Sequence, residues 1–134
     1  MTTATRYMTE KNLEKFQEDG FFILPGAVSE GDLKTLRGEC DKYVAEQNAW
    51  MDKQGVTTTG ITHKNSRYFI SNKWEQSPAI QKFLFGDLMR EITTATLGDE
   101  VYMFNEQFVV KFPEKGMHFG WHQDSGYIGK PHRP

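Results

Sequence analysis

Residues 101–112, Val-Tyr-Met-Phe-Asn-Glu-Gln-Phe-Val-Val-Lys-Phe, carry the clearest structural pattern in the chain. From Tyr102 to Phe112, most alternate positions hold a large apolar or aromatic side chain. Successive side chains of a strand point to opposite faces, so this period of two predicts one long β-strand. A turn is predicted at residues 113–116, and a second strand at about residues 119–124.

The residues that precede this strand predict helices. The first predicted helix is short and ends at Gly20. The second is longer and has apolar residues at steps of three and four. The third has Pro78 in its first turn. Gly98 ends the fourth. Each helix has a residue suited to cap its N-terminus. The predicted caps are Thr9, Ser29, Ser77 and Asp87.

Three further segments lie between the predicted helices. Residues 21–24 (FFIL) form a short apolar run that predicts a buried strand before the Pro25-Gly26 turn. Residues 51–66 are polar and rich in Thr, Gly and Asn, which predicts a mobile loop. Residues 67–71 (RYFIS) predict a short strand.

The order of these elements indicates an α+β fold, because helices come first and strands follow. The 134 residues suit a single domain, residues 1–134. A strand layer needs partners to bury both of its faces, and only the first strands of such a layer are present. We therefore expect this chain to be the N-terminal part of a larger fold.

Composition and charge exclude several classes of protein. The chain has 16 Lys and Arg against 18 Asp and Glu, a formal charge of −2, so nothing indicates nucleic acid or an anionic membrane as a partner. A single cysteine, Cys40, excludes an intramolecular disulfide and cysteine-ligated metal sites. No signal peptide or 18-residue apolar segment is visible, so the default expectation is a cytoplasmic protein.

The best candidate for chemistry is the segment Trp121-His122-Gln123-Asp124. On a strand, His122 and Asp124 would point to the same face, roughly 6.6 Å apart along it. One imidazole and one carboxylate so placed can reach one metal ion, and a second histidine would complete the facial triad of non-haem iron oxygenases. The spacing alone is equally typical of a surface His–Asp pair, and that alternative stays open.

Two separated motifs together resemble the phytanoyl-CoA dioxygenase family. The first is residues 16–26 (FQEDGFFILPG), followed by residues 28–33 (VSEGDL) at the start of a helix. The second is residues 121–127 (WHQDSGY), about a hundred residues later. The resemblance covers about residues 12–134.

The resemblance implies a double-stranded β-helix, also called a jelly roll, with iron(II) and the cosubstrate 2-oxoglutarate. His122 and Asp124 match the family's metal ligands. Gln107, Val109 and Phe119 match positions near 2-oxoglutarate, although ordinary strand packing explains these three residues equally well.

The family's second histidine ligand and its 2-oxoglutarate-binding arginine are expected beyond Pro134. His118 and His132 are weaker substitutes for that histidine, better explained by packing or solvation. His63 and Lys111 are expected to be solvated. Cys40 lies on an apolar helical stripe and is expected to be an inert, buried thiol.

The function implied by the resemblance is hydroxylation of a small molecule by an iron(II)- and 2-oxoglutarate-dependent dioxygenase. Related halogenases have a small residue at the position of Asp124 to admit chloride, so the carboxylate argues against halogenation. Two alternatives remain: a non-catalytic fragment, and an interaction module in which the His–Asp pair is incidental.

Overall fold

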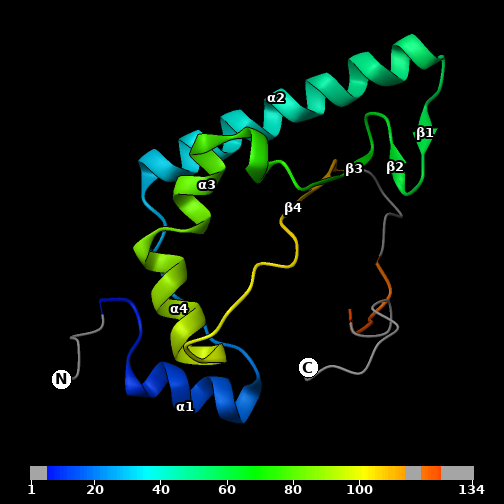
Figure 1. Cartoon of the computed structure of the whole chain (residues 1–134). Helices are drawn as coiled ribbons and strands as arrows, with labels where there is room; N and C mark the ends of the chain where they lie inside the picture. Colours follow the sequence, from blue (N-terminus) through cyan, green and yellow to red (C-terminus); the bar gives the residue numbers. More distant parts are fainter. Residues whose placement is uncertain (1–5, 114–118, 125–134) are drawn as a thin grey trace.

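The computed structural model describes residues 6–113 and 119–124. In these residues, two α-helices come before the first three strands of one antiparallel sheet, and two more α-helices lie between those strands and the last strand (Figure 1). The predicted α+β class is therefore confirmed. The elements are α1 (Glu10–Asp19), α2 (Glu30–Gln54), β1 (Thr58–Thr59), β2 (Thr62–His63), β3 (Arg67–Ser71), the 3-10 helix η1 (Trp74–Gln76), α3 (Pro78–Leu84), α4 (Asp87–Leu97) and β4 (Gln107–Lys111).

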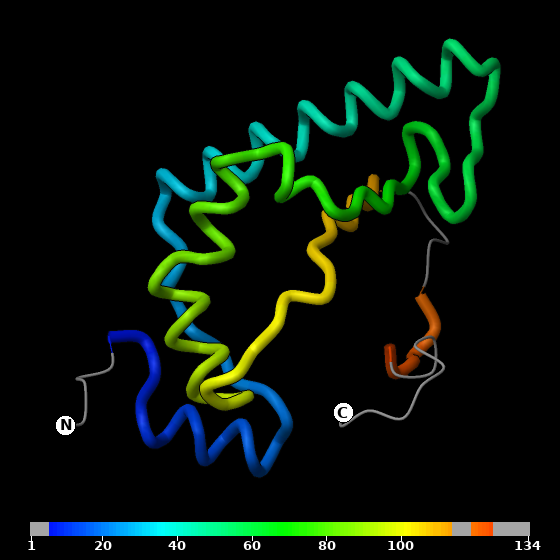
Figure 2. Tube along the Cα trace, in the orientation of Figure 1, coloured from blue at the N-terminus to red at the C-terminus, as the bar shows by residue number. Residues whose placement is uncertain are grey.

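The helices form one connected layer. α2 is the longest, and α3 and α4 follow one another away from it toward α1 (Figures 1 and 2). α3 contacts both α2 and α4, and α1 contacts α4. The segment between α4 and β4 returns from the α1 end of this layer to the sheet (Figure 2). Among the described helices, none combines the length and apolar character needed to cross a bilayer.

Local capping explains where the first three helices begin. The side-chain oxygens of Thr9, Ser29 and Ser77 each accept a hydrogen bond from the backbone N–H three residues further along, as predicted. Thr9 and Asn12 also form a reciprocal capping box. Gly20 ends α1 with a φ of 79°, a left-handed conformation that glycine adopts without steric cost.

The boundary between α3 and α4 depends on a close backbone contact at Gly86. The N-cap residue of α4 is Gly86, one residue before the predicted Asp87. A Cβ at Gly86 would lie 2.8 Å from the carbonyl oxygen of Lys82, so any side chain would force the two helices apart. Gly98 ends α4, as predicted.

The prediction of a mobile loop over residues 51–66 was wrong. α2 continues to Gln54 because Met51 is completely buried, and the helix ends at Gly55, whose φ is 66°. β1 and β2 then form a short antiparallel hairpin. The polar composition of this segment reflects its position on an edge hairpin, where most side chains face solvent.

The sheet has the order β1-β2-β3-β4, and all of its pairings are antiparallel. In β3 and β4, Arg67 is paired with Lys111 and Ser71 with Gln107. The strand predicted at residues 67–71 is confirmed.

One face of β3 and β4 forms the core with α2 and α3. Tyr68 and Ile70 of β3 are 0 % and 4 % exposed and contact Tyr43 of α2 and Ile80 of α3. Burial of each such side chain contributes about 1.5–3 kcal/mol. The partly buried members of this core are Val44, Trp74, Leu84, Phe108 and Val110.

Three predicted strands are absent or shorter than expected. Residues 21–24 and 119–124 are not in strands, and β4 covers only residues 107–111 of the predicted 101–112. The physical reason is the lack of a partner: β3 ends at Ser71, opposite Gln107, so residues 101–106 have no strand to pair with in the described part of the chain. The jelly roll stays a prediction.

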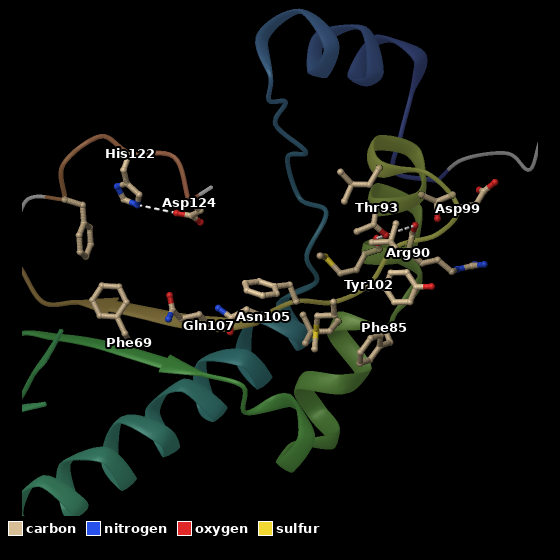
Figure 3. Close-up of a pocket in the computed structure, with 18 of the residues that line it drawn as sticks. Phe69, Phe85, Arg90, Thr93, Asp99, Tyr102, Asn105, Gln107, His122 and Asp124 are labelled. Carbon is tan, nitrogen blue, oxygen red and sulfur yellow. Dashed lines mark hydrogen bonds and ion pairs between the residues drawn. The ribbon is translucent and has the colours of Figure 1, made fainter. Parts of the chain in front are cut away.

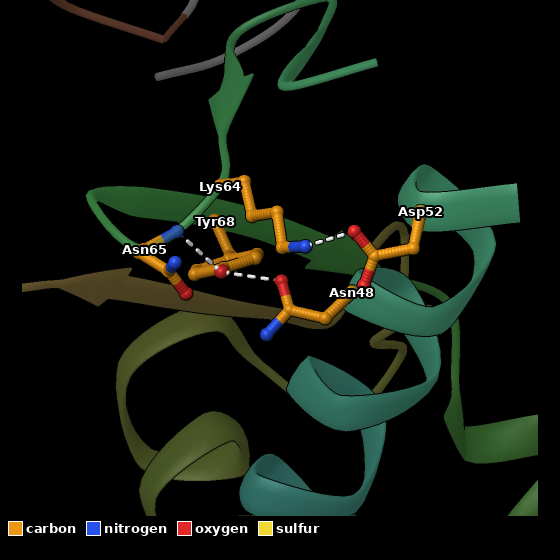
Figure 4. Close-up of polar contacts among 5 residues, drawn as sticks. All are labelled: Asn48, Asp52, Lys64, Asn65 and Tyr68. Carbon is orange, nitrogen blue, oxygen red and sulfur yellow. Dashed lines mark hydrogen bonds and ion pairs between the residues drawn. The ribbon is translucent and has the colours of Figure 1, made fainter. Parts of the chain in front are cut away.

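A buried tyrosine joins the β2–β3 turn to α2 (Figure 4). The Tyr68 hydroxyl accepts a hydrogen bond from the backbone N–H of Asn65 (2.6 Å) and donates one to Oδ1 of Asn48 (2.6 Å). An ion pair between Lys64 and Asp52 lies beside it. The hydroxyl therefore satisfies a turn N–H and a helix side chain at the same time.

A carboxylate on α4 holds the N-terminal segment. Glu91 accepts hydrogen bonds from the backbone N–H groups of Arg6 (3.1 Å), Tyr7 (2.6 Å) and Met8 (2.6 Å). Desolvation raises the pKa of Glu91, but the bonds from Met8, Tyr7 and Arg6 and the charge of Arg6 outweigh it, so the pKa lies below its usual value. This contact therefore adds stability above the unfolded-state pKa of about 4.3 and loses it as pH falls through the lower folded-state pKa.

We expect Tyr68→Phe to lower the free energy of unfolding by about 1–2 kcal/mol, because it leaves the Asn65 N–H and the Asn48 side chain without their partner. Urea unfolding followed by circular dichroism measures this change. The control is Tyr102→Phe, which removes a hydroxyl from a side chain that is 86 % exposed. Equal unfolding midpoints for the two variants would contradict the role given to the Tyr68 hydroxyl.

We expect Glu91→Ala to remove the hydrogen-exchange protection of the Tyr7 and Met8 amides, because the acceptor of both bonds is lost. In the unmodified chain, the same protection should disappear on acidification, below the pH at which an ordinary glutamate titrates. Glu100→Ala removes an exposed carboxylate elsewhere and should leave both amides protected. Protection that survives Glu91→Ala would show that another contact holds this segment.

Candidate functional site

The predicted metal ligands lie together in the segment of residues 119–124. His122 Nε2 is 3.4 Å from Asp124 Oδ1, and both side chains line one cavity (Figure 3). The expectation that the two project into a common cavity is met, but the backbone reason was wrong, because the segment is not a strand. Asp124 lies at a turn, and its carboxylate approaches the imidazole.

A backbone contact defines which nitrogen of His122 can face a metal ion. His122 Nδ1 lies 2.7 Å from the carbonyl oxygen of Gly120, and since a carbonyl only accepts, Nδ1 carries the proton. Nε2, the other ring nitrogen, then faces the Asp124 carboxylate. Two acceptors at 3.4 Å need a proton or a cation between them, and metal–ligand bonds of about 2.0–2.2 Å would reach both atoms. The pair therefore fits a metal ion as two of its ligands.

The third ligand is not found among the described residues. No group of three His, Cys, Asp or Glu side chains in residues 6–113 and 119–124 is arranged to hold a metal ion. His118 and His132, the two weaker candidates, lie outside the described residues.

The cavity has a volume of about 1420 Å³ and extends from the His–Asp pair to α4. Gln107 and Phe69 lie on the sheet below the pair, while Arg90, Thr93 and Tyr102 lie toward the opposite end (Figure 3). The lining residues are Ile61, Arg67, Phe69, Leu84, Phe85, Met89, Arg90, Thr93, Thr94, Leu97, Asp99, Val101, Tyr102, Met103, Phe104, Asn105, Gln107, Phe119, His122 and Asp124.

Of the three residues predicted near 2-oxoglutarate, Gln107 and Phe119 line this cavity and Val109 does not. Phe119 packs edge-on against Phe69, with ring centroids 5.6 Å apart. This contact places the segment of residues 119–124 over the face of the sheet that is turned away from the core. Val109 shares that face and is 47 % exposed.

The beginning of β4 is held by two side-chain contacts. The carboxylate of Glu106 accepts from the backbone N–H groups of Lys73 (3.1 Å) and Trp74 (3.2 Å), which fixes β4 against η1. The next residue, Gln107, donates from Nε2 to the Ser71 hydroxyl (2.7 Å). Gln107 is thereby oriented within the cavity by its strand neighbour.

Sequence reasoning missed Arg67, which lines the cavity from β3. Its strand partner is Lys111, which is exposed as expected, and whose Nζ also lies 4.7 Å from the centre of the Phe119 ring. The available signal was the alternation in residues 67–71, which puts Arg67 on the face opposite Tyr68.

His63 also differs from its prediction. It lies on β2, and Nη2 of Arg67 is 3.1 Å from its Nε2, so it is partnered by a cavity residue instead of being simply solvated. Cys40 is only partly buried, whereas a buried thiol was expected. Its partial burial, and secondarily the charge of Asp41, raise the pKa of the thiol.

Comparison with curated proteins found two distant relatives. The chain is 24% identical over 122 residues to a 2-aminoethylphosphonate dioxygenase of an uncultured bacterium (HF130_AEPn_1), covering 89% of this chain and 45% of that protein. It is 22% identical over 121 residues to a methylphosphonate hydroxylase of Gimesia maris, covering 88% of this chain and 45% of that protein. The chain thus spans about half the length of these relatives. No solved structure matches it.

The family comparison agrees with the motifs. Residues 16–134 match the sequence profile of the phytanoyl-CoA dioxygenase (PhyH) family. The match contains both the opening motif and the His122–Asp124 pair. His122 and Asp124 line one cavity. This chain belongs to the phytanoyl-CoA dioxygenase family.

Proposed function

We propose that this chain is the N-terminal part of an iron(II)- and 2-oxoglutarate-dependent dioxygenase that hydroxylates a small molecule. The observation that carries the proposal is the His122–Asp124 pair, with Nε2 and Oδ1 3.4 Å apart at a shared cavity. Membership of the family and the names of the two relatives support it.

In this proposal, His122 and Asp124 hold iron(II) as two of three protein ligands. When bound, the metal supplies the redox chemistry by which O₂, with 2-oxoglutarate as electron donor, hydroxylates a C–H bond. The Gly120 carbonyl keeps His122 in the tautomer that presents Nε2. Asp124 adds a negative charge beside the cation and occupies the position that a halogenase would leave open for chloride.

The cavity beside the pair also holds a cation, Arg67. Arg67 has no carboxylate within 4 Å among the described residues, and its strand partner Lys111 has none either. Like charges directly opposite each other in a sheet are destabilising, and an anion beside them offsets this repulsion. Arg90, the other arginine of the cavity, is instead paired with Asp87. Arg67 is therefore a cation suited to pair with an anionic group of the substrate, while the arginine that binds 2-oxoglutarate in this family is expected beyond Pro134.

The names of the relatives suggest the first substrates to test. One acts on 2-aminoethylphosphonate and the other on methylphosphonate, so these two compounds come first. The two alternative readings, a non-catalytic fragment and an interaction module, differ from this proposal in one measurable property. Neither requires a metal ion at the His122–Asp124 pair.

We expect His122→Ala and Asp124→Ala each to weaken Fe(II) binding by about tenfold or more, because each removes a direct ligand, and even loss of an outer-shell partner costs about 10–100-fold. Anaerobic calorimetry of the 134-residue chain measures the affinity. The control is Asp99→Ala, which removes a carboxylate from the far end of the same cavity. Equal affinities for all four proteins would favour the interaction module.

We expect the 134-residue chain alone to form no succinate from 2-oxoglutarate with iron(II), ascorbate and oxygen. The His122–Asp124 pair supplies only two ligands, and metal affinity depends on their number and geometry. Metal-dependent succinate formation at about 1 per second or faster, a rate typical of enzymes, would contradict this expectation. In that case, His118→Ala and His132→Ala would show which histidine completes the site.

A further inference from the structure

The segment of residues 119–124, which carries the two candidate metal ligands, meets the sheet at Phe119. The Phe119 ring packs edge-on against Phe69 of β3, with ring centroids 5.6 Å apart. The ammonium nitrogen of Lys111, the last residue of β4, lies 4.7 Å from the centre of the same ring. One residue from each of the two paired strands therefore contacts this single aromatic side chain.

The contacts that shape the His122–Asp124 pair stay within the segment itself. His122 Nδ1 lies 2.7 Å from the carbonyl oxygen of Gly120, and His122 Nε2 lies 3.4 Å from Oδ1 of Asp124. These contacts set the geometry of the pair. They cannot place the pair relative to β3 and β4, because both partners of each contact move with the segment. The position of the pair over the sheet therefore depends on contacts that leave the segment, and Phe119 makes two of them.

The surroundings of Lys111 favour its contact with the ring. No carboxylate lies within 4 Å of its ammonium group in residues 6–113 and 119–124. Its strand partner is a second cation, Arg67, whose Nε–H donates to the carbonyl oxygen of Ile61 (2.8 Å). Like charges opposite each other in a sheet repel, and the face of an aromatic ring attracts a cation. The Phe119 ring therefore offers the Lys111 ammonium group a favourable position away from the guanidinium.

We propose that Lys111 is a positioning residue, whose ammonium group holds the Phe119 ring against the sheet and thereby fixes the candidate metal ligands over the outer face of β3 and β4. Phe69 supplies the second contact of the ring. The inference rests on the proposed function in one respect, because the His122–Asp124 pair is taken to bind a metal ion. Ligands that are already in place lose less conformational freedom when the ion binds.

The test uses Mn(II) as a paramagnetic probe, titrated into the full 134-residue chain and followed by NMR. Broadening of the His122 ring signals reports that the ion binds at the pair. Broadening of the Gln107 side-chain amide signals reports that the bound ion lies over the sheet. Gln107 lies on the sheet below the pair (Figure 3), and paramagnetic broadening falls steeply with distance. Binding and placement are thus measured separately in one sample.

Two replacements of Lys111 separate its charge from its bulk. Lys111→Met keeps an unbranched apolar side chain and removes the charge, whereas Lys111→Arg keeps a cation that can lie over a ring. Lys34→Met removes the charge of an exposed lysine on α2 and is the control. Phe119→Ala removes the ring that both contacts require.

We expect Lys111→Met to lower the equilibrium ratio of sheet-bound to released segment about two- to fivefold, as an exposed cation–π contact predicts. The Gln107 broadening should fall with this ratio while the His122 broadening persists. Phe119→Ala should remove most of the Gln107 broadening. Lys111→Arg and Lys34→Met should retain it, and equal unfolding midpoints for all variants would show that the fold is intact.

Two outcomes would overturn the inference. If Lys111→Met leaves the Gln107 broadening unchanged, Lys111 does not position the pair. If Lys111→Met and Lys111→Arg reduce the broadening equally, the positive charge is not the cause, and the inference is also wrong.

A third outcome concerns the proposed function alone. If Mn(II) broadens no His122 signal in the unmodified chain, the metal site fails. Nuclear Overhauser effects between the Phe119 and Phe69 rings then measure the placement of the segment without a metal ion. Their loss in Lys111→Met and retention in Lys111→Arg would still support the role of Lys111 in that placement, and their retention in both would contradict it.

Discussion

The antiparallel pairing of β3 with β4 is the constraint on which the rest of the structure depends. It joins residues 67–71 to residues 107–111, about forty positions apart in the chain, and it separates their side chains onto two faces. One face carries Tyr68 and Ile70 into the core beneath α2 and α3. The other carries Arg67 and Phe69 toward the cavity. A shift of one residue in this register would exchange the two sets, so core and site are specified together.

The site is built on the outer face of this pairing by weak contacts that act together. Phe119 packs on Phe69 and brings the segment of residues 119–124 over the sheet. The Gly120 carbonyl orients His122, and the Asp124 carboxylate approaches its ring. Since the segment makes no strand ladder with β3 or β4, its position over the sheet depends on side-chain packing, in particular the contacts of Phe119 with Phe69 and Lys111. A metal ion between His122 and Asp124 would add the strongest link in this segment.

The local signals in the sequence were sufficient for much of the fold. The caps Thr9, Ser29 and Ser77 were predicted because a hydroxyl placed before a helix satisfies its free N–H groups, a property of neighbouring residues only. Residues 21–24 were wrongly predicted as a strand because an apolar run does not show whether a partner strand exists. Phe21 and Ile23 are instead 57 % and 72 % exposed.

The sequence by itself determined the α+β class, the family and the identity of the candidate ligands His122 and Asp124, because each of these follows from residue type and short spacing. Only the tertiary structure decided that Arg67 lies beside the cavity and that His63 and Ile61 orient it. Those contacts join residues on different strands, and their geometry follows from the register of the sheet. Register is a long-range property, because it depends on which side chains can be buried in the core formed by α2, α3 and the sheet. No local sequence pattern predicts it.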